Sequence, residues 1–292
     1  MYNLDSDYYE TYLQRLDAVT IEDISRVANK YITPDVARIV VVGNKDEVME
    51  KLVPFDLEDG KIQLYDIYAN PRKDESGPVD ITAEELIGKY IMAIGGKEKV
   101  ASVKTVDQTY SLEMMGMELT SRAVQSEGKF FMNMSAPGMN IMTQKFDGTN
   151  GKVEQMGQAP MNIEGDDLAS MKEQSILFPE RFYTTDGYSA EVTGIEDLDG
   201  TACYKLSVIK PSGTKSTEFY DKETHLKLKE VQVSEAEGQT STTTFEFADY
   251  QAVDGVSIPH KVTMSGPMPQ PIVMKAISIK VNGEVDPELF KL

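Results

Sequence analysis

The apolar and polar residues of this chain follow one periodicity before residue 70 and a different one after residue 79. Upstream, apolar residues recur three or four positions apart, which predicts helices around one short buried strand. Downstream, after one more helical stretch, apolar and polar residues alternate, which predicts strands. The segment between the two patterns reads Asn-Pro-Arg-Lys-Asp-Glu-Ser-Gly-Pro, a composition typical of linkers. We therefore predict a segment at 1–70, a linker at 71–79 and a separate domain at 80–292.

The upstream segment predicts a helix, a strand and a helix. Thr20 and Asp23 have the spacing of a capping box, and Val19 is placed to pack on Ile24 at the start of a helix. Residues 37–42 form an apolar run that predicts a buried strand; residues 46–52 predict a short helix and residues 5–16 an earlier one. Because one strand needs partners to be stable, this segment is expected to be the remnant of a larger domain.

The downstream segment predicts a helix followed by one large antiparallel sheet. Thr82 and Glu85 form a second capping box, and Gly95-Gly96 ends the helix. A short helical or lid-like insertion is expected around 164–182. Strands are expected near 106–112, 117–123, 130–134, 141–145, 187–196, 201–210, 214–221, 225–234, 240–249, 256–265 and 273–281. The expected fold class is α+β, mostly antiparallel, with the sheet curved into a half-barrel and helices covering its concave face.

Methionines gather in the first part of this sheet. Ten of the 16 methionines fall between Met114 and Met171, and the chain has no tryptophan. Flexible thioethers suit a surface that accepts varied apolar shapes, although the same residues would serve equally well as core filler. If the hollow of the sheet is open, its predicted ligand-binding residues are Tyr110, Leu112, Met117, Leu119, Phe130, Met132 and Met134.

Composition limits the classes of partner. The net charge of −19 disfavours binding to nucleic acid and to anionic membranes. No apolar run approaches the roughly 18 residues that a membrane-spanning helix needs. The amino terminus shows neither the basic nor the apolar region of an export signal, so the chain is expected either to stay in the cytoplasm or to be the tail of a longer exported polypeptide.

The sequence predicts no catalytic residue, metal site or cofactor. The two histidines, His225 and His260, have no second histidine or acid at helical spacing, and there is no G-x-S-x-G nucleophile motif or glycine-rich phosphate loop. Cys203 alternates with Ala202 and Tyr204 on a predicted strand and has no basic neighbour that would activate it. We therefore interpret Cys203 as an ordinary strand residue, and the chain as not an enzyme.

The amino-acid sequence of the upstream segment resembles one known family. Val19-Thr-Ile-Glu-Asp-Ile-Ser-Arg-Val-Ala-Asn-Lys-Tyr-Ile-Thr-Pro-Asp and Ile39-Val-Val-Val-Gly-Asn are similar to the last elements of a pitrilysin/insulinase-type zinc peptidase domain, over about residues 5–55. The metal motif of that family, H-x-x-E-H, has no match in this chain. The resemblance therefore implies a peptidase fragment without its catalytic part.

The amino-acid sequence of the downstream segment resembles a second family over about residues 80–292. Ile81-Thr-Ala-Glu-Glu-Leu-Ile-Gly-Lys-Tyr-Ile-Met-Ala-Ile-Gly-Gly-Lys-Glu-Lys-Val is similar to the opening helix of LolA/LolB-like lipoprotein carrier domains. Tyr220-Asp-Lys-Glu-Thr and Phe247-Ala-Asp-Tyr-Gln-Ala-Val-Asp-Gly-Val-Ser-Ile-Pro-His-Lys-Val are similar to its later hairpins. The resemblance implies an unclosed antiparallel barrel that binds acyl chains in the bacterial periplasm. Arg122 is the nearest strand position to the lid-locking arginine of the carriers.

Three functions follow from these observations. The first is a non-catalytic envelope domain that holds a lipid or lipoprotein acyl chain in its curved sheet. The second is the accessory C-terminal part of a zinc peptidase, which would position a substrate or a partner subunit. The third is an interaction module whose core is filled by its own side chains. The amount of free space inside the sheet distinguishes the first from the third.

Overall fold

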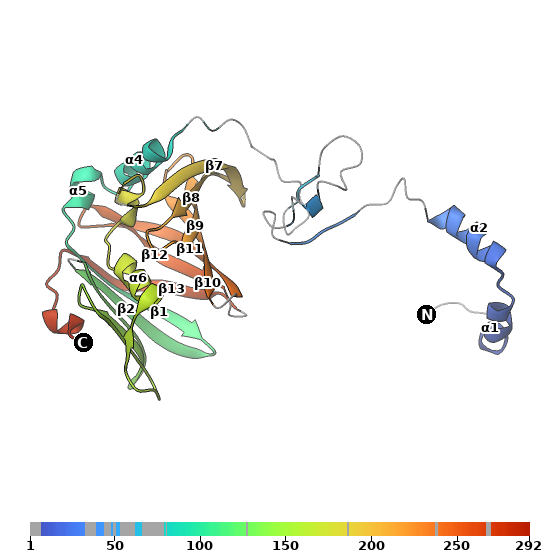
Figure 1. The fold of residues 1–292 in the computed structure, drawn as a ribbon, viewed down its shortest axis with the longest axis horizontal. Coiled ribbons are helices and arrows are strands. Elements are labelled where there is room, and N and C mark those ends of the chain that lie inside the picture. Colours follow the sequence, from blue (N-terminus) through green and yellow to red (C-terminus); the bar gives the residue numbers. More distant parts are fainter. Residues whose placement is uncertain are drawn as a thin grey trace. The chain divides into compact units, whose positions relative to one another are not determined.

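The computed structural model describes residues 7–32, 39–43, 48, 51–52, 62–65, 79, 81–126, 128–185, 187–236, 239–266 and 270–292. The chain divides into two compact units, Met1–Gln63 and Leu64–Leu292 (Figure 1). The predicted sheet and its leading helix belong to the second unit.

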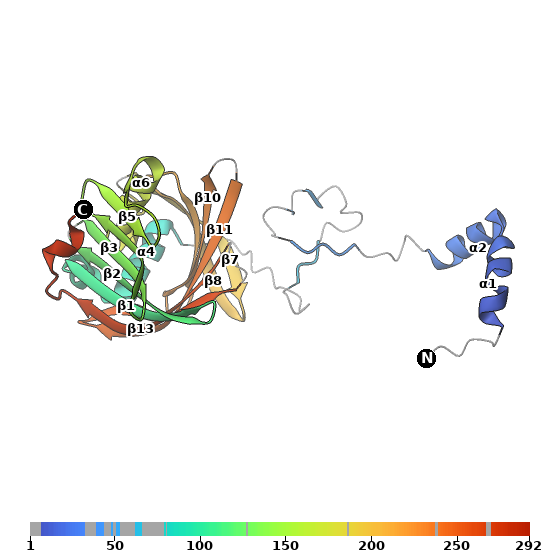
Figure 2. The same cartoon turned by 90° about the horizontal axis from the view of Figure 1, so that it is seen from below.

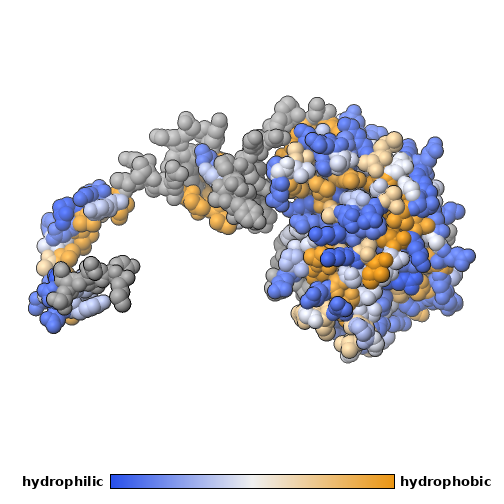
Figure 3. Space-filling model, turned by 180° about the vertical axis from the view of Figure 1, so that it is seen from behind, coloured by the Kyte–Doolittle hydropathy of each residue, from blue (hydrophilic) through white to orange (hydrophobic). Residues whose placement is uncertain are grey.

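The first unit contains two helices, α1 (Tyr8–Asp17) and α2 (Ile21–Tyr31). The predicted capping box of α2 is present: the Asp23 amide donates to Thr20 Oγ1 at 3.1 Å, and the Thr20 amide donates to the Asp23 carboxylate at 3.4 Å. Apolar residues line one side of α2 (Figure 3) and are exposed, as at Ile24 and Val27.

The predicted strand at 37–42 is wrong for the residues that the structure describes. Ile39–Val42 belong to no strand, and all four side chains are exposed. An apolar run becomes a strand only when a neighbouring strand receives its hydrogen bonds, and no strand pairing among the described residues includes this run. Residues 37–38 lie outside the described part; of the predicted helix at 46–52, residues 48, 51 and 52 are described and are helical.

The second unit is built on one 13-stranded antiparallel sheet, which confirms the predicted fold class. Strands β1–β6 form one meander and β7–β13 another, and the pairing of β1 with β13 joins them. The strands are β1 Thr105–Met114, β2 Met117–Ser126, β3 Lys129–Ala136, β4 Met139–Phe146, β5 Gly151–Gln155, β6 Met161–Ile163, β7 Ser189–Leu198, β8 Thr201–Ile209, β9 Lys215–Asp221, β10 Lys227–Ala236, β11 Gln239–Val253, β12 Val256–Ser265 and β13 Ile272–Val281.

The two edges of the sheet are β6 and β7, which follow one another in the sequence. The sheet curves so that β3 and β5 lie across from β10 and β11 (Figure 2). The connection from β6 to β7 is the predicted insertion, and it carries helix α6 (Gly165–Gln174) and the short 3-10 helix η3 (Pro179–Phe182). This connection therefore runs from one open edge of the half-barrel to the other.

Helices cover the inner face of the sheet. Helix α4 (Ala83–Ala93) packs Leu86, Tyr90 and Ile94 in one buried cluster with Leu206 and Tyr220 of the sheet. Helix α6 packs Met171 on Phe130 and Phe146, again on the inner face. The short α5 (Lys97–Ala101) follows α4, and the 3-10 helix η4 (Pro287–Phe290) packs Phe290 on the opposite, outer face against Val124 and Phe131.

The end of α4 is fixed to the turn between β11 and β12. The Ser257 amide donates to the Ile94 carbonyl at 2.8 Å. Gly95, at φ +137°, passes so close that a Cβ there would lie 2.4 Å from the Gly255 carbonyl oxygen. A glycine is therefore required at this helix end, and the contact sets where α4 lies over the sheet.

The capping box of α4 offers a test of how much this helix contributes to stability. Thr82 Oγ1 accepts from the Glu85 amide at 3.2 Å, and the Glu85 carboxylate accepts from the Thr82 amide at 2.9 Å. Replacing Thr82 with alanine should lower the free energy of unfolding by about 1 kcal/mol, because the Glu85 amide loses its acceptor. Urea denaturation followed by tyrosine fluorescence would measure it. Thr20→Ala, which removes the equivalent cap of α2, should leave this transition unchanged; an equal loss would contradict the assignment.

Candidate ligand-binding site

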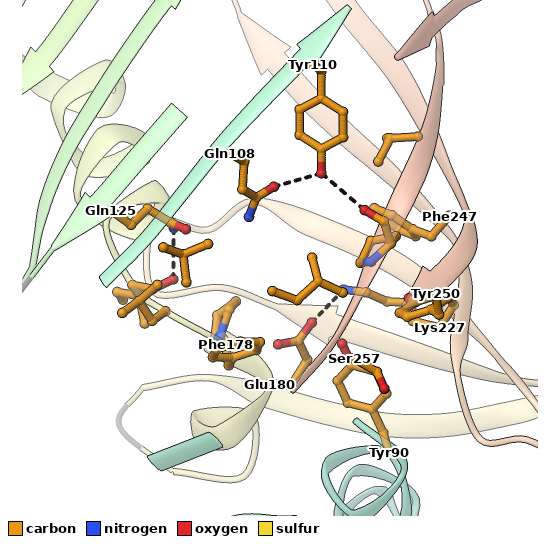
Figure 4. Close-up of a pocket in the computed structure, with 17 residues that line it drawn as sticks. Tyr90, Gln108, Tyr110, Gln125, Phe178, Glu180, Lys227, Phe247, Tyr250 and Ser257 are labelled. Carbon is orange, nitrogen blue, oxygen red and sulfur yellow. Dashed lines mark hydrogen bonds and ion pairs between the residues drawn. The ribbon is translucent and has the colours of Figure 1, made fainter. Parts of the chain in front are cut away.

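A cavity of about 240 Å³ lies on the inner face of the sheet, between the strands, α4 and the insertion (Figure 4). Its wall combines apolar side chains with a few polar groups, as ligand pockets usually do. It is lined by Tyr90, Val106, Gln108, Tyr110, Gln125, Ile176, Leu177, Phe178, Pro179, Glu180, Lys227, Phe247, Tyr250, Ser257, Ile258, Pro259 and Val262.

Strand β1 supplies one wall through its two-residue repeat. Val106, Gln108 and Tyr110 alternate along the strand and so share its inner face. The Tyr110 hydroxyl donates to Gln108 Oε1 at 2.8 Å and lies 3.2 Å from the Pro259 carbonyl oxygen. Burial raises the pKa of Tyr110 to about 12, so the hydroxyl stays protonated and available as a donor.

The insertion forms the opposite wall. Gln125 of β2 donates its side-chain amide to the carbonyls of Gln174 and Ile176, which ties the start of this wall to the sheet (Figure 4). Phe178 has a left-handed backbone conformation, φ +51°, directly before η3. This turn directs the chain into η3, which brings Glu180 to the edge of the cavity.

A buried cluster of charges fixes η3 to the sheet. Lys227 Nζ of β10 lies 2.7 Å from Glu180 Oε1, 3.2 Å from Glu230 Oε2 and 3.6 Å from Glu218 Oε2. Lys210 Nζ lies 3.3 Å from Glu230 Oε1. Three carboxylates therefore share two ammonium groups in the interior, where each charge requires a partner.

Two tyrosines complete the surroundings of Glu218. The Tyr183 hydroxyl donates to Glu218 Oε1 at 2.6 Å, and the Tyr220 hydroxyl donates to Glu218 Oε2 at 2.5 Å. Burial raises the pKa of Glu218 to about 7, with Lys227 opposing the shift. Burial acts on Glu230 in the same direction, but Lys227 and Lys210 outweigh it and hold the pKa of Glu230 at about 2. The pKa values of the two carboxyls are thus shifted in opposite directions from the ordinary value of a glutamate.

The predicted ligand-binding residues occupy one face of the sheet but fall into separate groups. Tyr110 lines the cavity. Leu112, Leu119 and Met134 meet in one apolar cluster beyond it. Phe130 and Met132 pack beneath α6, so the protein's own helix covers them. Met117 is half exposed beside the turn between β1 and β2.

Sequence reasoning missed the polar part of the site. The alternation placed Gln108 on the same face as Val106 and Tyr110, and the helical spacing placed Tyr90 on the apolar stripe of its helix, but neither pattern shows that a polar group faces a cavity. Lys227 gave no signal, because a charged residue on a strand is expected to face the solvent. Glu218 lies between Ser216 and Tyr220 on the inner face of β9, a pattern that an exposed strand would show equally well. The pairing of Lys227 with Glu180, 47 positions away, could be seen only in the fold.

The remaining candidate residues have structural environments. Burial, together with the nearby carboxylates of Asp221 and Asp197, raises the pKa of the Cys203 thiol to about 12. The thiol is therefore not an activated nucleophile. His260 Nδ1 lies 2.9 Å from the Ile258 carbonyl oxygen, and His225 occupies a turn at φ +59°. Arg122 pairs with Asp107 across β1 and β2 through two contacts of 2.8 and 3.0 Å, so it is engaged within the sheet. Within the described residues, no group of three or more His, Cys, Asp and Glu is arranged to hold a metal ion.

None of the helices that the structure describes is both long enough and apolar enough to cross a membrane.

The chain was compared with known proteins at three levels. No family model matches it, and no curated protein matches its sequence. Its structure is similar to a DUF1329 family protein of Desulfovibrio piger, with a TM-score of 0.49 and 14% identity over 72% of this chain and 97% of the other. It is similar to a LolA superfamily protein of Nitrosomonas europaea, with a TM-score of 0.48 and 11% identity over 73% and 98%. It is also similar to a putative outer membrane lipoprotein-sorting protein domain of Vibrio parahaemolyticus, with a TM-score of 0.44 and 16% identity over 71% and 97%.

Proposed function

We propose that residues 80–292 form a non-catalytic domain that binds a hydrophobic ligand, an acyl chain or the lipid of a lipoprotein, on the inner face of the curved sheet. The observation that carries this proposal is the cavity, together with the apolar cluster that lies beyond it on the same face of the sheet. A cavity bounded by a curved sheet, with an apolar floor beside it, suits a long apolar molecule better than a small polar substrate.

The apolar floor extends along the strands that line the cavity. On β1, Tyr110 is followed on the same face by Leu112 and Met114; on β12, Val262 is followed by Met264. The floor consists of Leu112, Leu119 and Ile272, with Met114, Met134, Ala136, Ile141, Met264 and Met274 packed around them. Four of these flanking side chains are methionines, whose flexibility allows the floor to adapt to a ligand.

We further propose that the domain acts in the cell envelope as part of a longer exported polypeptide, with residues 71–79 as its linker. The resemblance of the sequence of residues 81–100 to LolA/LolB-like carrier domains supports this localisation. Association with a zinc peptidase stays a prediction from the amino-acid sequence of residues 5–55. The structure of the described residues in that segment does not test it.

Native mass spectrometry of the purified full chain tests the proposal. The protein should carry a copurified lipid, or should bind 1-monolauroylglycerol after delipidation, at one molecule per chain. The same mass with and without every apolar probe offered would contradict the proposal and would favour a filled interaction module.

A matched pair of substitutions on β13 tests the location of the ligand. Met274 belongs to the floor, whereas its neighbour Val273 is on the outer face and exposed. Met274→Glu should weaken binding of 1-monolauroylglycerol at least tenfold, because a carboxylate would have to be buried against the acyl chain. Isothermal titration calorimetry would measure this. Val273→Glu adds the same charge and should bind like the unmodified chain; equal weakening in both variants would place the ligand elsewhere.

A further inference from the structure

Two polar groups of the cavity have no hydrogen-bond partner among the described residues. Tyr90 is 6% exposed and reaches into the cavity from α4, yet its hydroxyl makes no hydrogen bond to any residue that the structure describes. Gln108 accepts a hydrogen bond at its Oε1, while its Nε2 donates to none of the described residues. Figure 4 shows these two side chains entering the cavity from different walls. Gln108 is half-buried, and both side chains line the cavity, so a ligand in the cavity can supply the partner that each group lacks.

The charged groups around the cavity are already paired. Among the described lining residues Lys227 is the cation and Glu180 the anion, and they bind each other at 2.7 Å. Behind them, Glu218, Glu230 and Lys210 bring the cluster to three carboxylates and two ammonium groups. A carboxylate or phosphate entering the cavity would find no spare cation and an excess of negative charge. Burial of such a group without a counterion is strongly unfavourable.

The free donors therefore require an acceptor that carries no charge. Gln108 Nε2 can only donate, and the Tyr90 hydroxyl can donate or accept. An ester carbonyl or an alcohol oxygen satisfies these donors without adding charge. A cationic amine would be attracted by the carboxylates but could not accept from Gln108.

We infer that the cavity receives the uncharged, oxygen-bearing head group of an ester lipid such as an acylglycerol, and that it discriminates against free fatty acids. This inference rests on the proposed function and adds the ligand class and its orientation. The head group lies between Tyr90 and Gln108. The acyl chain follows β1 and β12 from Tyr110 and Val262 over the apolar floor, toward the turn that joins β1 to β2.

Three probes with the same 12-carbon chain test the inference: 1-monolauroylglycerol, laurate and dodecylamine. Binding to the delipidated full chain would be measured by calorimetry at pH 8, where laurate is charged. The glycerol ester should bind at least tenfold more tightly than laurate and more tightly than the amine. Laurate binding as tightly as the ester would overturn the inference, and so would dodecylamine binding most tightly, which would indicate a cation site at Glu180.

Substitution of Tyr90 identifies the contact. Tyr90→Phe removes only a hydroxyl that has no hydrogen-bond partner among the residues that the structure describes, so the fold should keep its stability. The affinity for 1-monolauroylglycerol should fall about three- to tenfold, the effect of one hydrogen bond, while dodecylamine binding stays constant. Tyr204→Phe, on the inner face of β8 but outside the cavity lining, serves as the control and should change neither affinity.

The outcomes distinguish a failure of this head-group inference from a failure of the proposed function, acyl-chain binding. If all three probes bind equally well and Tyr90→Phe has no effect, the head-group inference is overturned, whereas acyl-chain binding stands. If none of the three probes binds, both are overturned.

Discussion

Replacing Lys227 with methionine is expected to lower the free energy of unfolding of the sheet unit by about 3–5 kcal/mol at pH 8. Lys227 Nζ is the shared partner of Glu180, Glu218 and Glu230, at distances between 2.7 and 3.6 Å. Without Lys227, the three buried carboxylates keep Lys210 as the one cation of the cluster, and Lys210 contacts Glu230. The carboxylates would repel one another, and Glu180 would lose the donor that lies 2.7 Å from it. This cost far exceeds the value of an exposed ion pair.

The Lys227→Met variant should recover part of this loss when the pH is lowered. Its remaining carboxyls can then be protonated, which removes the uncompensated charge. Urea denaturation at pH 8 and pH 5 would show both effects. Lys229→Met is the matched control on the same strand: Lys229 lies over the ring of Phe219 at 5.6 Å, outside the buried cluster, and its loss should cost about 1 kcal/mol or less. Equal losses in the two variants would mean that the cluster does not hold the structure together.

Glu218 is expected to make the protein less stable as the pH rises from about 4.5 to about 7. Burial raises its pKa in the folded state from 4.5 to about 7, so the folded protein holds this proton more tightly than the unfolded chain does. The contribution is fully present below pH 4.5 and is lost as the pH rises through 7. At about 1.4 kcal/mol per pH unit, the change is on the order of 3 kcal/mol.

Glu218→Gln should remove this dependence. The melting temperature of the unmodified chain should fall relative to that of the variant between pH 5 and pH 8, as measured by differential scanning calorimetry. Glu230 does not interfere in this window, because its pKa of about 2 places its stabilising contribution at risk only below pH 4.5. Glu191→Gln, an exposed acid on β7, is the control and should run parallel to the unmodified chain. Parallel curves for all three proteins would contradict the assignment.

The fold could be predicted in large part from local sequence. Both capping boxes, Thr20 with Asp23 and Thr82 with Glu85, are present where the sequence placed them. The 11 predicted strands of the sheet unit are found with small shifts of their ends, because period-two alternation survives wherever one face of a sheet is buried. Strands β5 and β6 were missed, since five and three residues between turns leave too little pattern to recognise.

The site was harder to predict than the fold. Alternation identified the inner face of β1–β3, and with it Tyr110, Leu112 and Met134. It could not show that α6 would cover Phe130 and Met132, because that depends on how the insertion crosses from β6 to β7. It also could not show which charged residues are buried, because Lys227 is stabilised there only by glutamates that come from other elements.

The central claim is that the inner face beside Tyr110 is an accessible surface for an acyl chain. Methionine-methyl NMR of the full chain, labelled with ¹³C at the methionine methyl groups and titrated with 1-monolauroylglycerol, tests it directly. Signals of Met134, Met264 and Met274 should shift together and saturate at one ligand per chain, while exposed Met92 on α4 stays in place. Unchanged floor methionines, or shifts confined to exposed ones such as Met92, would contradict the account.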